Sequence, residues 1–423
     1  MPTKLKHLCK CGLVPPSADR AEQPLAVIGG GLVGCALALA LARAGLPVTL
    51  LDQGSAPGPV IDDRRTVALA PDVLAFLASL GVKVVGSDYQ HMTVWEHAGP
   101  AALHFSAEEM GLLRLGAIVE NDRLRRDLAE AAAAAGVTLR WGAAVTGVRW
   151  PSAGAGPALR LGDEVPLPVR LVCAADGGQS PVRGMAGIGT QDEPMGQRAV
   201  VTTVITERPH GATAWQRFLP TGPLAFLPLA DDEAGRHRCS VVWSADEPEA
   251  RALEALDDEA FCAALGEAFE YRLGAILAAK PRAAFPLSQR HADCYAAPGL
   301  VLLGDAAHVV HPLAGQGVNL GLRDVMALMP VLCQGAARGT LGDPRIFAGY
   351  ERSRRRDNAL MLTALSALKR GFAPASGPLS WLRQGGLGWL DHQPAVRQRF
   401  MVQALGLDGT RPPAHVFKEG VVS

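Results

Sequence analysis

The alternation of apolar and polar residues near the start of the chain predicts a strand, a helix and a second strand in close succession. An apolar run from Leu25 to Ile28 is typical of a buried strand, and glycines follow it directly. The next run, Cys35 to Ala44, is rich in alanine and leucine and stops before Gly45, a residue type that commonly ends helices. A second apolar run, 47–51, leads into Asp52. This order is that of a βαβ unit in a parallel sheet.

Periodicity along the rest of the chain predicts a mixture of helices and strands. Helical spacing follows an arginine pair within 62–82 and recurs at 121–135, 250–278, 318–336 and in a long helix that begins near 347. Alternating or apolar runs predict strands at 137–141, 144–150, 169–174 and over most of 198–245. The long final helix carries Arg352, Arg354, Arg355 and Arg356 near its start, where cations oppose the helix dipole. We interpret these arginines as a solvated face, with contact to an acidic partner or lipid as the alternative.

The glycines after the first strand match the pattern G-x-G-x-x-G. Gly29 allows a tight turn, Gly31 lets a pyrophosphate approach the backbone, and Gly34 lets the helix pack closely on the strand. The helix N-terminus offers free N–H groups to phosphates, and Asp52 can accept hydrogen bonds from ribose hydroxyls. An acid at this position disfavours the extra phosphate of NADP. The motif therefore predicts NAD or FAD and does not choose between them.

Composition narrows the class of protein. The chain has 423 residues, 48% of them hydrophobic, and a formal net charge of zero, so it lacks the basic field that nucleic-acid binding requires. Its eight scattered cysteines suit a reducing compartment. Residues 25–42 carry no charge, but the glycines within them favour a strand and a buried helix over a membrane span. We expect a cytoplasmic protein, and treat 1–23 as a flexible N-terminal extension.

A second glycine-rich stretch, "LLGDAAHVVHPLAGQGVNLG" at 302–321, raises three alternatives: a metal site, a nucleophile or a cofactor cradle. His308 and His311 stand one helical turn apart, a spacing used by metal sites. No further paired ligands are evident, so a metal is not predicted. The Gly315-Gln316-Gly317 turn instead favours close approach to a flat ring. His308 is interpreted as structural, and His311 stays the candidate that faces a reaction centre.

Together, the motifs resemble those of a known family. The glycine motif at 29–34, "ADG" at 175–177 and "GDAAH" at 304–308 are in the order seen in FAD-dependent aromatic hydroxylases of the para-hydroxybenzoate hydroxylase type. Within that group, "GDAAHVVHPLAGQGVNLGLRDV", "IVENDRLRRDL" and "RFLPTGPLAFLPLADD" resemble the ubiquinone-biosynthesis hydroxylases. The resemblance extends from about residue 24 to residue 408.

The resemblance implies a set of site residues. The ADP half of FAD would lie on the first glycine motif and Asp52, and Arg65 would lie near the pyrophosphate or flavin. Asp176, Gly177 and Arg183 would help bind FAD and the visiting nicotinamide, while Asp305 would bond a ribityl hydroxyl and the helix after Gly317 would direct its positive end at the flavin. The residues predicted to bind cofactor are Gly29, Gly31, Gly34, Asp52, Arg65, Asp176, Gly177, Arg183, Gly304, Asp305, Pro312, Gly315, Gln316, Gly317 and Asn319. Phe218 and Phe226 are candidates for the substrate pocket, with an ordinary core strand as the equal alternative.

The resemblance also implies an activity. It is ring hydroxylation of a polyprenyl phenol or quinol by FAD, NAD(P)H and O₂ through a flavin C4a-hydroperoxide. A hydroxylase of another small aromatic compound and a non-catalytic flavoprotein subunit stay open as alternatives. The C-terminal sequence leans towards C5 or C6 hydroxylation rather than C1. A substrate with a long apolar tail implies peripheral contact with the inner membrane or association with other ubiquinone-biosynthesis proteins.

The implied fold is α/β, or α+β overall. A Rossmann-type FAD-binding domain is expected from 24–82, 117–190 and 286–340. An inserted antiparallel-sheet substrate domain is expected from 83–116 and 191–285, and a helical region from 341–423. The oligomeric state is not predicted.

Overall fold

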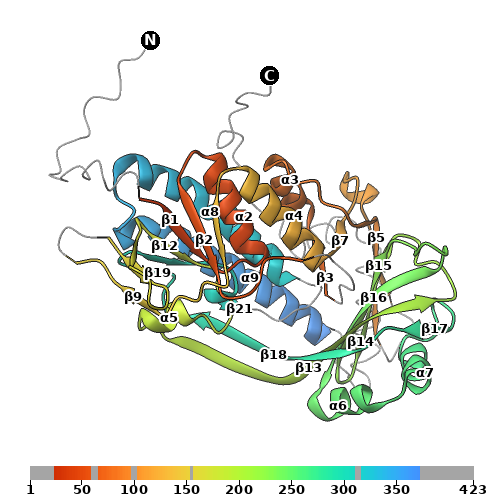
Figure 1. Ribbon diagram of the computed structural model, residues 1–423. Coiled ribbons are helices and arrows are strands. Elements are labelled where there is room, and N and C mark those ends of the chain that lie inside the picture. The colour runs from red at the N-terminus through yellow and green to blue at the C-terminus, as the bar shows by residue number, and fades with distance from the viewer. Residues whose placement is uncertain (1–22, 59–64, 97–101, 153–155, 310–315, 372–423) are drawn as a thin grey trace, which may run out of the picture.

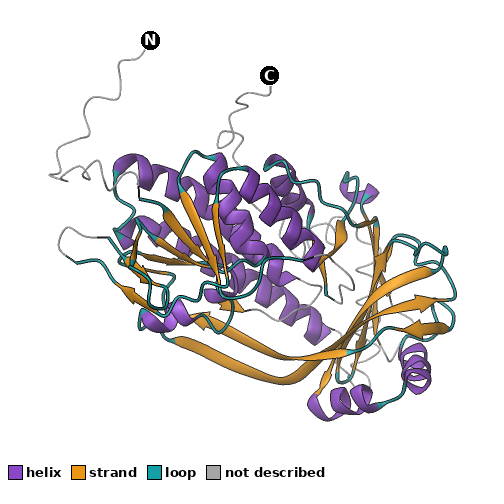
Figure 2. Ribbon diagram, in the orientation of Figure 1, coloured by secondary structure: helices purple, strands orange, loops and turns teal. Residues whose placement is uncertain are grey.

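The computed structural model describes residues 23–58, 65–96, 102–152, 156–309 and 316–371. These residues form two parts (Figure 1): a parallel sheet covered by helices, and a large antiparallel sheet beside it. Figure 2 shows that most of the helical chain gathers around the parallel sheet, while α6 (Glu247–Ala255) and α7 (Asp258–Ala268) lie at the far end of the antiparallel one. The expected α/β fold is confirmed. The predicted extension 1–23 lies almost wholly outside the described residues.

The parallel sheet is the framework of the first part. Its strand order is β19-β20-β12-β1-β2-β8, parallel throughout except for the short edge pair β19 and β20. The predicted strand–helix–strand unit is confirmed as β1, α2 and β2. The strands are β1 (Leu25–Ile28), β2 (Val48–Asp52), β8 (Thr138–Trp141), β12 (Val172–Ala174), β19 (Ala296–Ala297) and β20 (Leu300–Leu302).

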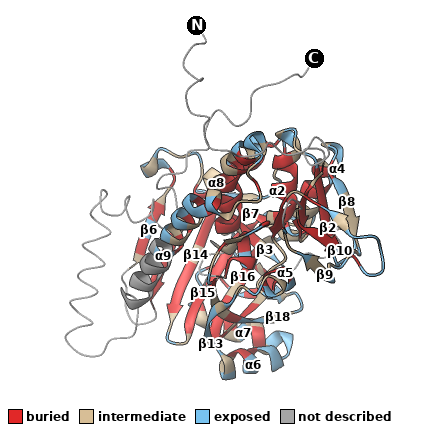
Figure 3. Cartoon of the chain, turned by 90° about the vertical axis from the view of Figure 1, so that its left-hand side faces the viewer, coloured by how far each residue is buried: buried red, intermediate tan, exposed pale blue. Residues whose placement is uncertain are grey.

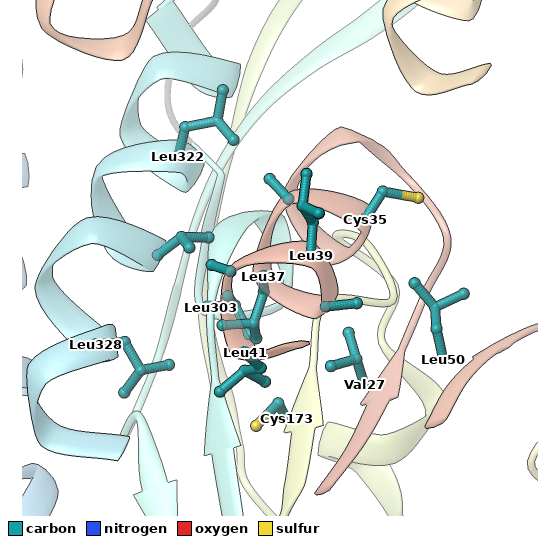
Figure 4. Close-up of a cluster of buried hydrophobic side chains, with 14 of the residues drawn as sticks. Val27, Cys35, Leu37, Leu39, Leu41, Leu50, Cys173, Leu303, Leu322 and Leu328 are labelled. Carbon is teal, nitrogen blue, oxygen red and sulfur yellow. The ribbon is translucent and has the colours of Figure 1, made fainter. Parts of the chain in front are cut away.

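Helices α2 (Leu32–Arg43), α4 (Asn121–Ala134) and α8 (Gln316–Arg338) pack together on this sheet. Because α2 contacts the strands and both neighbouring helices, it is apolar nearly all round, which explains the uncharged stretch seen in the sequence. Figure 4 shows leucines of α2 lying between the leucines of α8 and the sheet residues Val27 and Cys173. No helix in the described part of the chain is long and apolar enough to cross a membrane.

The antiparallel sheet has the strand order β21-β18-β13-β16-β15-β14-β5-β6, and β17 also pairs with β13; only the pair β14–β5 within it is parallel. The long strands β13 and β18 run from this sheet back to the parallel one (Figure 1), and β21 belongs to the "GDAAH" segment. Strand β15 is buried along its whole length (Figure 3). The strands are β5 (His91–Glu96), β6 (Ala102–Ser106), β13 (Thr190–Thr206), β14 (Thr213–Leu219), β15 (Gly222–Leu229), β16 (His237–Asp246), β17 (Ile276–Ala279), β18 (Ala283–Ala292) and β21 (His308–Val309).

Two smaller sheets and the remaining helices complete the fold. One sheet joins β3 (Thr66–Leu69), β7 (Gly116–Glu120) and β4 (Ser87–Tyr89); the other joins β9 (Gly147–Arg149), β10 (Ala158–Arg160) and β11 (Leu167–Pro168). The α-helices are α3 (Pro71–Ser79), α5 (Pro181–Met185), α6 (Glu247–Ala255), α7 (Asp258–Ala268) and α9 (Ala348–Gly371), and short 3₁₀ turns lie at Glu108–Met110, Gly304–Ala306 and Pro344–Phe347. Strands β7, β13 and β18 each span a predicted domain boundary, at 116/117, 190/191 and 285/286, and β4 pairs with β7 rather than with the large sheet.

The single helix predicted over 250–278 is wrong. Helix α6 ends at Ala255, because Leu256 is extended and Asp257 starts a new helix by accepting a hydrogen bond from the Ala260 amide. Helix α7 then ends where Glu270 and Tyr271 adopt positive φ, and β17 follows. Amphipathic periodicity continues across these breaks, because both helices bury one face against the same sheet.

Candidate flavin site

In the first glycine turn, Gly29 and Gly34 lie too close to other backbone atoms for a side chain to fit, whereas Gly31 faces open space. Gly29 has φ +103°, and a Cβ there would lie 2.3 Å from the Ala175 carbonyl oxygen. A Cβ on Gly34 would lie 1.9 Å from the Gly29 carbonyl oxygen, so only glycine lets α2 pack this closely. A Cβ on Gly31 would meet no atom within 4 Å. The turn is thus closed towards the protein and open at Gly31, where a phosphate can approach the start of α2.

Asp52 lies beside this turn with its carboxylate already oriented. Its Oδ2 accepts a hydrogen bond from the Gly30 amide at 2.5 Å, and its Oδ1 accepts one from the Gly54 amide at 2.6 Å. Arg125 of α4 donates from Nε to the Gly30 carbonyl at 2.6 Å, and its guanidinium lies 5.3 Å from the Trp141 ring centroid. Sequence reasoning did not select Arg125, because nothing in the "RLRR" run distinguishes the arginine that reaches the glycine turn.

The Asp176-Gly177 turn provides a second set of groups at the carboxyl end of β12. The Asp176 Oδ2 accepts a hydrogen bond from the Val182 amide at 3.1 Å, while Oδ1 is buried and has no partner among the described residues. Burial raises the pKa of this carboxyl group. Gly177 has φ +86°, with open space where a Cβ would stand. A buried acceptor beside an open backbone suits a bound hydroxyl-bearing group.

Arg183 joins this turn to the "GDAAH" segment. Its buried guanidinium donates from Nη1 to the Ala306 carbonyl at 2.8 Å and from Nη2 to the Gly178 carbonyl at 2.9 Å. In the structure, Arg183 therefore ties two loops of the site together. Its predicted contact with a cofactor stays a prediction.

The "GDAAH" segment follows β20 as one 3₁₀ turn. Gly304 and Ala306 are buried, whereas Asp305 between them is exposed. Surrounding protein nevertheless desolvates the Asp305 carboxyl and raises its pKa; His308 opposes this rise, and Asp324 adds a smaller one. Asp305 is therefore accessible to a bound ligand, and its predicted bond to a ribityl hydroxyl stays a prediction.

The start of α8 is held against the rest of the site by Asn319. This residue is fully buried; its Oδ1 accepts from the Ala70 amide at 2.9 Å and its Nδ2 donates to the Ala68 carbonyl at 2.7 Å. Asn319 thus places α8 relative to β3 and α3, and its predicted contact with the cofactor stays a prediction. A Cβ on Gly317 would meet no atom within 4 Å, so the first turn of α8 is open on that side.

Replacing Asn319 by alanine should destabilise the apoprotein by about 2–4 kcal/mol, because the Ala70 amide and the Ala68 carbonyl would both be left buried without partners. Urea denaturation measures this change. Asn121→Ala is the matched control: its side chain is only half-buried and donates to the adjacent Asp122, so a change within about 0.5 kcal/mol is expected. Equal effects of the two substitutions would contradict this assignment.

Several predicted residues are not brought to the site by described contacts. His311, Pro312 and Gly315 lie outside the described residues, and Gln316 is the first residue of α8. Arg65 is exposed and forms an ion pair with Asp122 at 3.4 Å.

The predicted solvated face of α9 is wrong for two of its arginines. Arg352 and Arg356 are exposed, but Arg354 is buried and forms an ion pair with Asp324 of α8 at 2.6 Å. Arg355 donates to two backbone carbonyls at the end of β18. A cation can be buried here because the partner carboxylate comes from another helix, a contact that helical periodicity does not reveal.

The two phenylalanines proposed for a substrate pocket lie on opposite faces of the antiparallel sheet. Phe218 packs with Tyr89 and Ile118 on the face turned towards β3, β4 and β7. Phe226 lies on the other face and stacks on Phe269 after α7, with ring centroids 3.8 Å apart. Successive side chains of a strand alternate between faces, and the β14–β15 register puts these two residues out of phase. Phe226 is therefore core, and only Phe218 is kept as a pocket candidate.

The residues present fit FAD: an open glycine turn at a helix N-terminus, an oriented acid after β2, and a partnerless buried oxygen at Asp176. The family model described as an FAD binding domain matches residues 22–363. The solved structure of p-nitrophenol 4-monooxygenase PnpA from Pseudomonas putida DLL-E4 has the same fold, with a TM-score of 0.74 at 19% identity over 92% of this chain and 99% of that one.

Curated relatives give a closer match over nearly the whole chain. The 3-demethoxyubiquinol 3-hydroxylase of Escherichia coli (strain K12) is 36% identical, covering 90% of this chain and 98% of that protein. The ubiquinone hydroxylase UbiL of Rhodospirillum rubrum is 37% identical, covering 95% and 94%. The chain therefore belongs to the ubiquinone-biosynthesis hydroxylase family of FAD-dependent aromatic monooxygenases, as its sequence motifs predicted.

Proposed function

We propose that this chain hydroxylates the aromatic ring of a polyprenylated phenol or quinol in ubiquinone biosynthesis, using NAD(P)H and O₂. The observation that carries the proposal is the match to hydroxylases named for ubiquinone intermediates, along 90–95% of this chain. The glycine turn, the Asp176 turn and the "GDAAH" segment all lie within the part of the chain that the family model matches, which supports the prediction that they bind the cofactor.

The geometry supports a substrate site between the two parts of the molecule. The inner face of the antiparallel sheet is apolar around Phe218, and it is joined to β3 by a hydrogen bond of 2.7 Å between the hydroxyls of Thr66 and Ser240. Strand β3 leads directly to the backbone that Asn319 holds at the start of α8. An apolar wall so close to the cofactor-binding segments suits an aromatic ring with a hydrocarbon tail.

When bound, FAD would accept electrons from NAD(P)H and activate O₂. The protein supplies binding and orientation: the first glycine turn would hold the pyrophosphate, Asp52 the adenosine ribose, and Asp305 the ribityl chain. The apolar face around Phe218 would exclude water from the reacting ring. The tail of the substrate would bring the chain to a membrane surface or into a complex of pathway enzymes, which co-sedimentation with lipid vesicles would detect.

The holoenzyme should oxidise NAD(P)H severalfold faster when a polyprenylated phenol is added, and the product should contain one oxygen atom from labelled O₂. Mass spectrometry of the quinone fraction measures the product, and complementation of strains blocked at each ring-hydroxylation step identifies the carbon. The control is the same phenol without its prenyl tail. Preference for the tailless phenol would replace the proposal by a small-aromatic hydroxylase, and NAD(P)H oxidation that no phenol stimulates would leave a non-catalytic flavoprotein.

A further inference from the structure

A buried cluster of charges lies directly behind the "GDAAH" segment. Asp324 of α8 is completely buried, and its Oδ2 accepts hydrogen bonds from the Gly304 amide at 2.8 Å and from His308 Nε2 at 2.7 Å. Its Oδ1 accepts from Arg354 Nε of α9 at 2.6 Å. Both ends of the segment that presents Asp305 are therefore bonded to one carboxylate oxygen.

The carboxyl group of Asp324 is ionised despite its burial. Burial alone would raise the pKa of Asp324, but the neighbouring His308 and Arg354 outweigh it and hold the pKa at about 2. Asp324 is then a carboxylate that can only accept, so His308 Nε2 carries the proton in this bond. Arg354 also donates to the Leu320 carbonyl and to Asp357, which holds the guanidinium in one orientation.

The cluster does more than hold two helices together. Replacing a buried ion pair by apolar residues is often neutral for stability, so stability alone is a weak reason to bury this one. Two hydrogen bonds to Asp324, from the Gly304 amide and His308 Nε2, instead set where the 304–308 segment lies relative to α8, and the bond from Arg354 fixes the Asp324 carboxylate itself. That segment and the first turn of α8 are the parts expected to face the flavin.

We infer that Asp324 and Arg354 are positioning residues for the flavin, acting through the Gly304 amide and His308 on the segment that carries Asp305. Helix α9 is then part of the cofactor site, although none of the contacts of Arg354 described above is with a residue predicted to bind FAD. This inference rests on FAD binding by the family and not on which phenol is hydroxylated.

Helix α8 offers a matched control in the residue next to Asp324. Arg323 forms a second buried pair, with bonds of 2.7 and 2.9 Å to Asp72 of α3, on a side of the helix away from the "GDAAH" segment. The test compares Asp324→Leu/Arg354→Leu with Asp72→Leu/Arg323→Leu. Each double variant removes one buried pair from α8 without leaving a lone charge.

The first double variant should bind FAD about tenfold to a hundredfold more weakly, the scale of a lost charge-assisted hydrogen bond, and should shift the midpoint potential of its flavin. The control, Asp72→Leu/Arg323→Leu, should keep the FAD affinity and the midpoint potential of the parent, even if its melting temperature falls as much as that of the first double variant. Titration of the apoprotein with FAD and spectroelectrochemistry measure them without any phenol, so failure of the proposed substrate would not affect the result.

Two single variants at His308 keep the inference testable if a double variant fails to fold. His308→Gln retains a nitrogen donor at the position of Nε2 and should keep FAD affinity within about twofold of the parent. His308→Leu removes the donor and should weaken FAD binding about tenfold. The inference is overturned if the two double variants lose FAD affinity equally, or if the glutamine and leucine variants behave alike.

Discussion

Replacing Gly34 by alanine is expected to destabilise the apoprotein by about 3 kcal/mol or more, because the added Cβ would stand 1.9 Å from the backbone oxygen of Gly29. No side-chain rotation can relieve a clash with backbone, so α2 must move away from β1. This movement would also open the turn, and FAD binding should be lost with stability. Urea denaturation of the apoprotein and its titration with FAD measure the two effects.

Gly31→Ala is the informative control in the same turn. Its Cβ would meet no protein atom within 4 Å, and Gly31 has an ordinary φ of −78°, so apoprotein stability should change by less than about 1 kcal/mol. FAD binding should still weaken strongly, because the methyl group would occupy the space through which the pyrophosphate approaches. A Gly31→Ala protein with normal FAD affinity would refute the assignment of this turn to the cofactor.

Replacing Arg354 by leucine is expected to cost about 3–5 kcal/mol of stability, because Asp324 would remain as a buried charge without its arginine partner. The loss should be smaller when Asp324 is also replaced. Arg352→Leu, an exposed position on the same helix, should change stability by no more than about 0.5 kcal/mol. Thermal and urea denaturation of the three proteins check this ordering, and an Arg354→Leu protein as stable as the Arg352→Leu protein would contradict it.

The sign of the pH dependence follows from the direction of the Asp324 pKa. In the parent, the folded-state pKa of about 2 lies below the unfolded value, so the stabilisation is complete above the unfolded pKa and is lost only as the pH falls towards 2. Without Arg354, His308 alone would oppose the effect of burial, so the pKa of Asp324 should rise from its value in the parent, and protonation would relieve the buried charge. The deficit of Arg354→Leu relative to the parent should therefore shrink between about pH 7 and pH 4. A constant deficit would indicate that the lost side-chain packing, and not the charge, sets the cost.

The opening βαβ unit could be derived from sequence alone, because its determinants are local. Gly29, Gly31 and Gly34 act within one turn, and the apolar runs on either side specify strand or helix by their own periodicity. The same holds for helix α4, predicted at 121–135 and found at Asn121–Ala134. The motif at 302–321 likewise indicated the correct family, because such a motif is a specific order of residue types that can be recognised in the sequence without the structure.

The second layer of the site depended on tertiary structure. Arg354 and Asp324 are 30 positions apart on two helices, and only the packing of α9 on α8 brings them together. Phe218 and Phe226 looked equivalent in the sequence, but sheet register places them on opposite faces. Local periodicity in the sequence shows that one face of a helix or strand is buried. Strand register and helix packing between distant segments decide which partner buries it, and these depend on the whole fold.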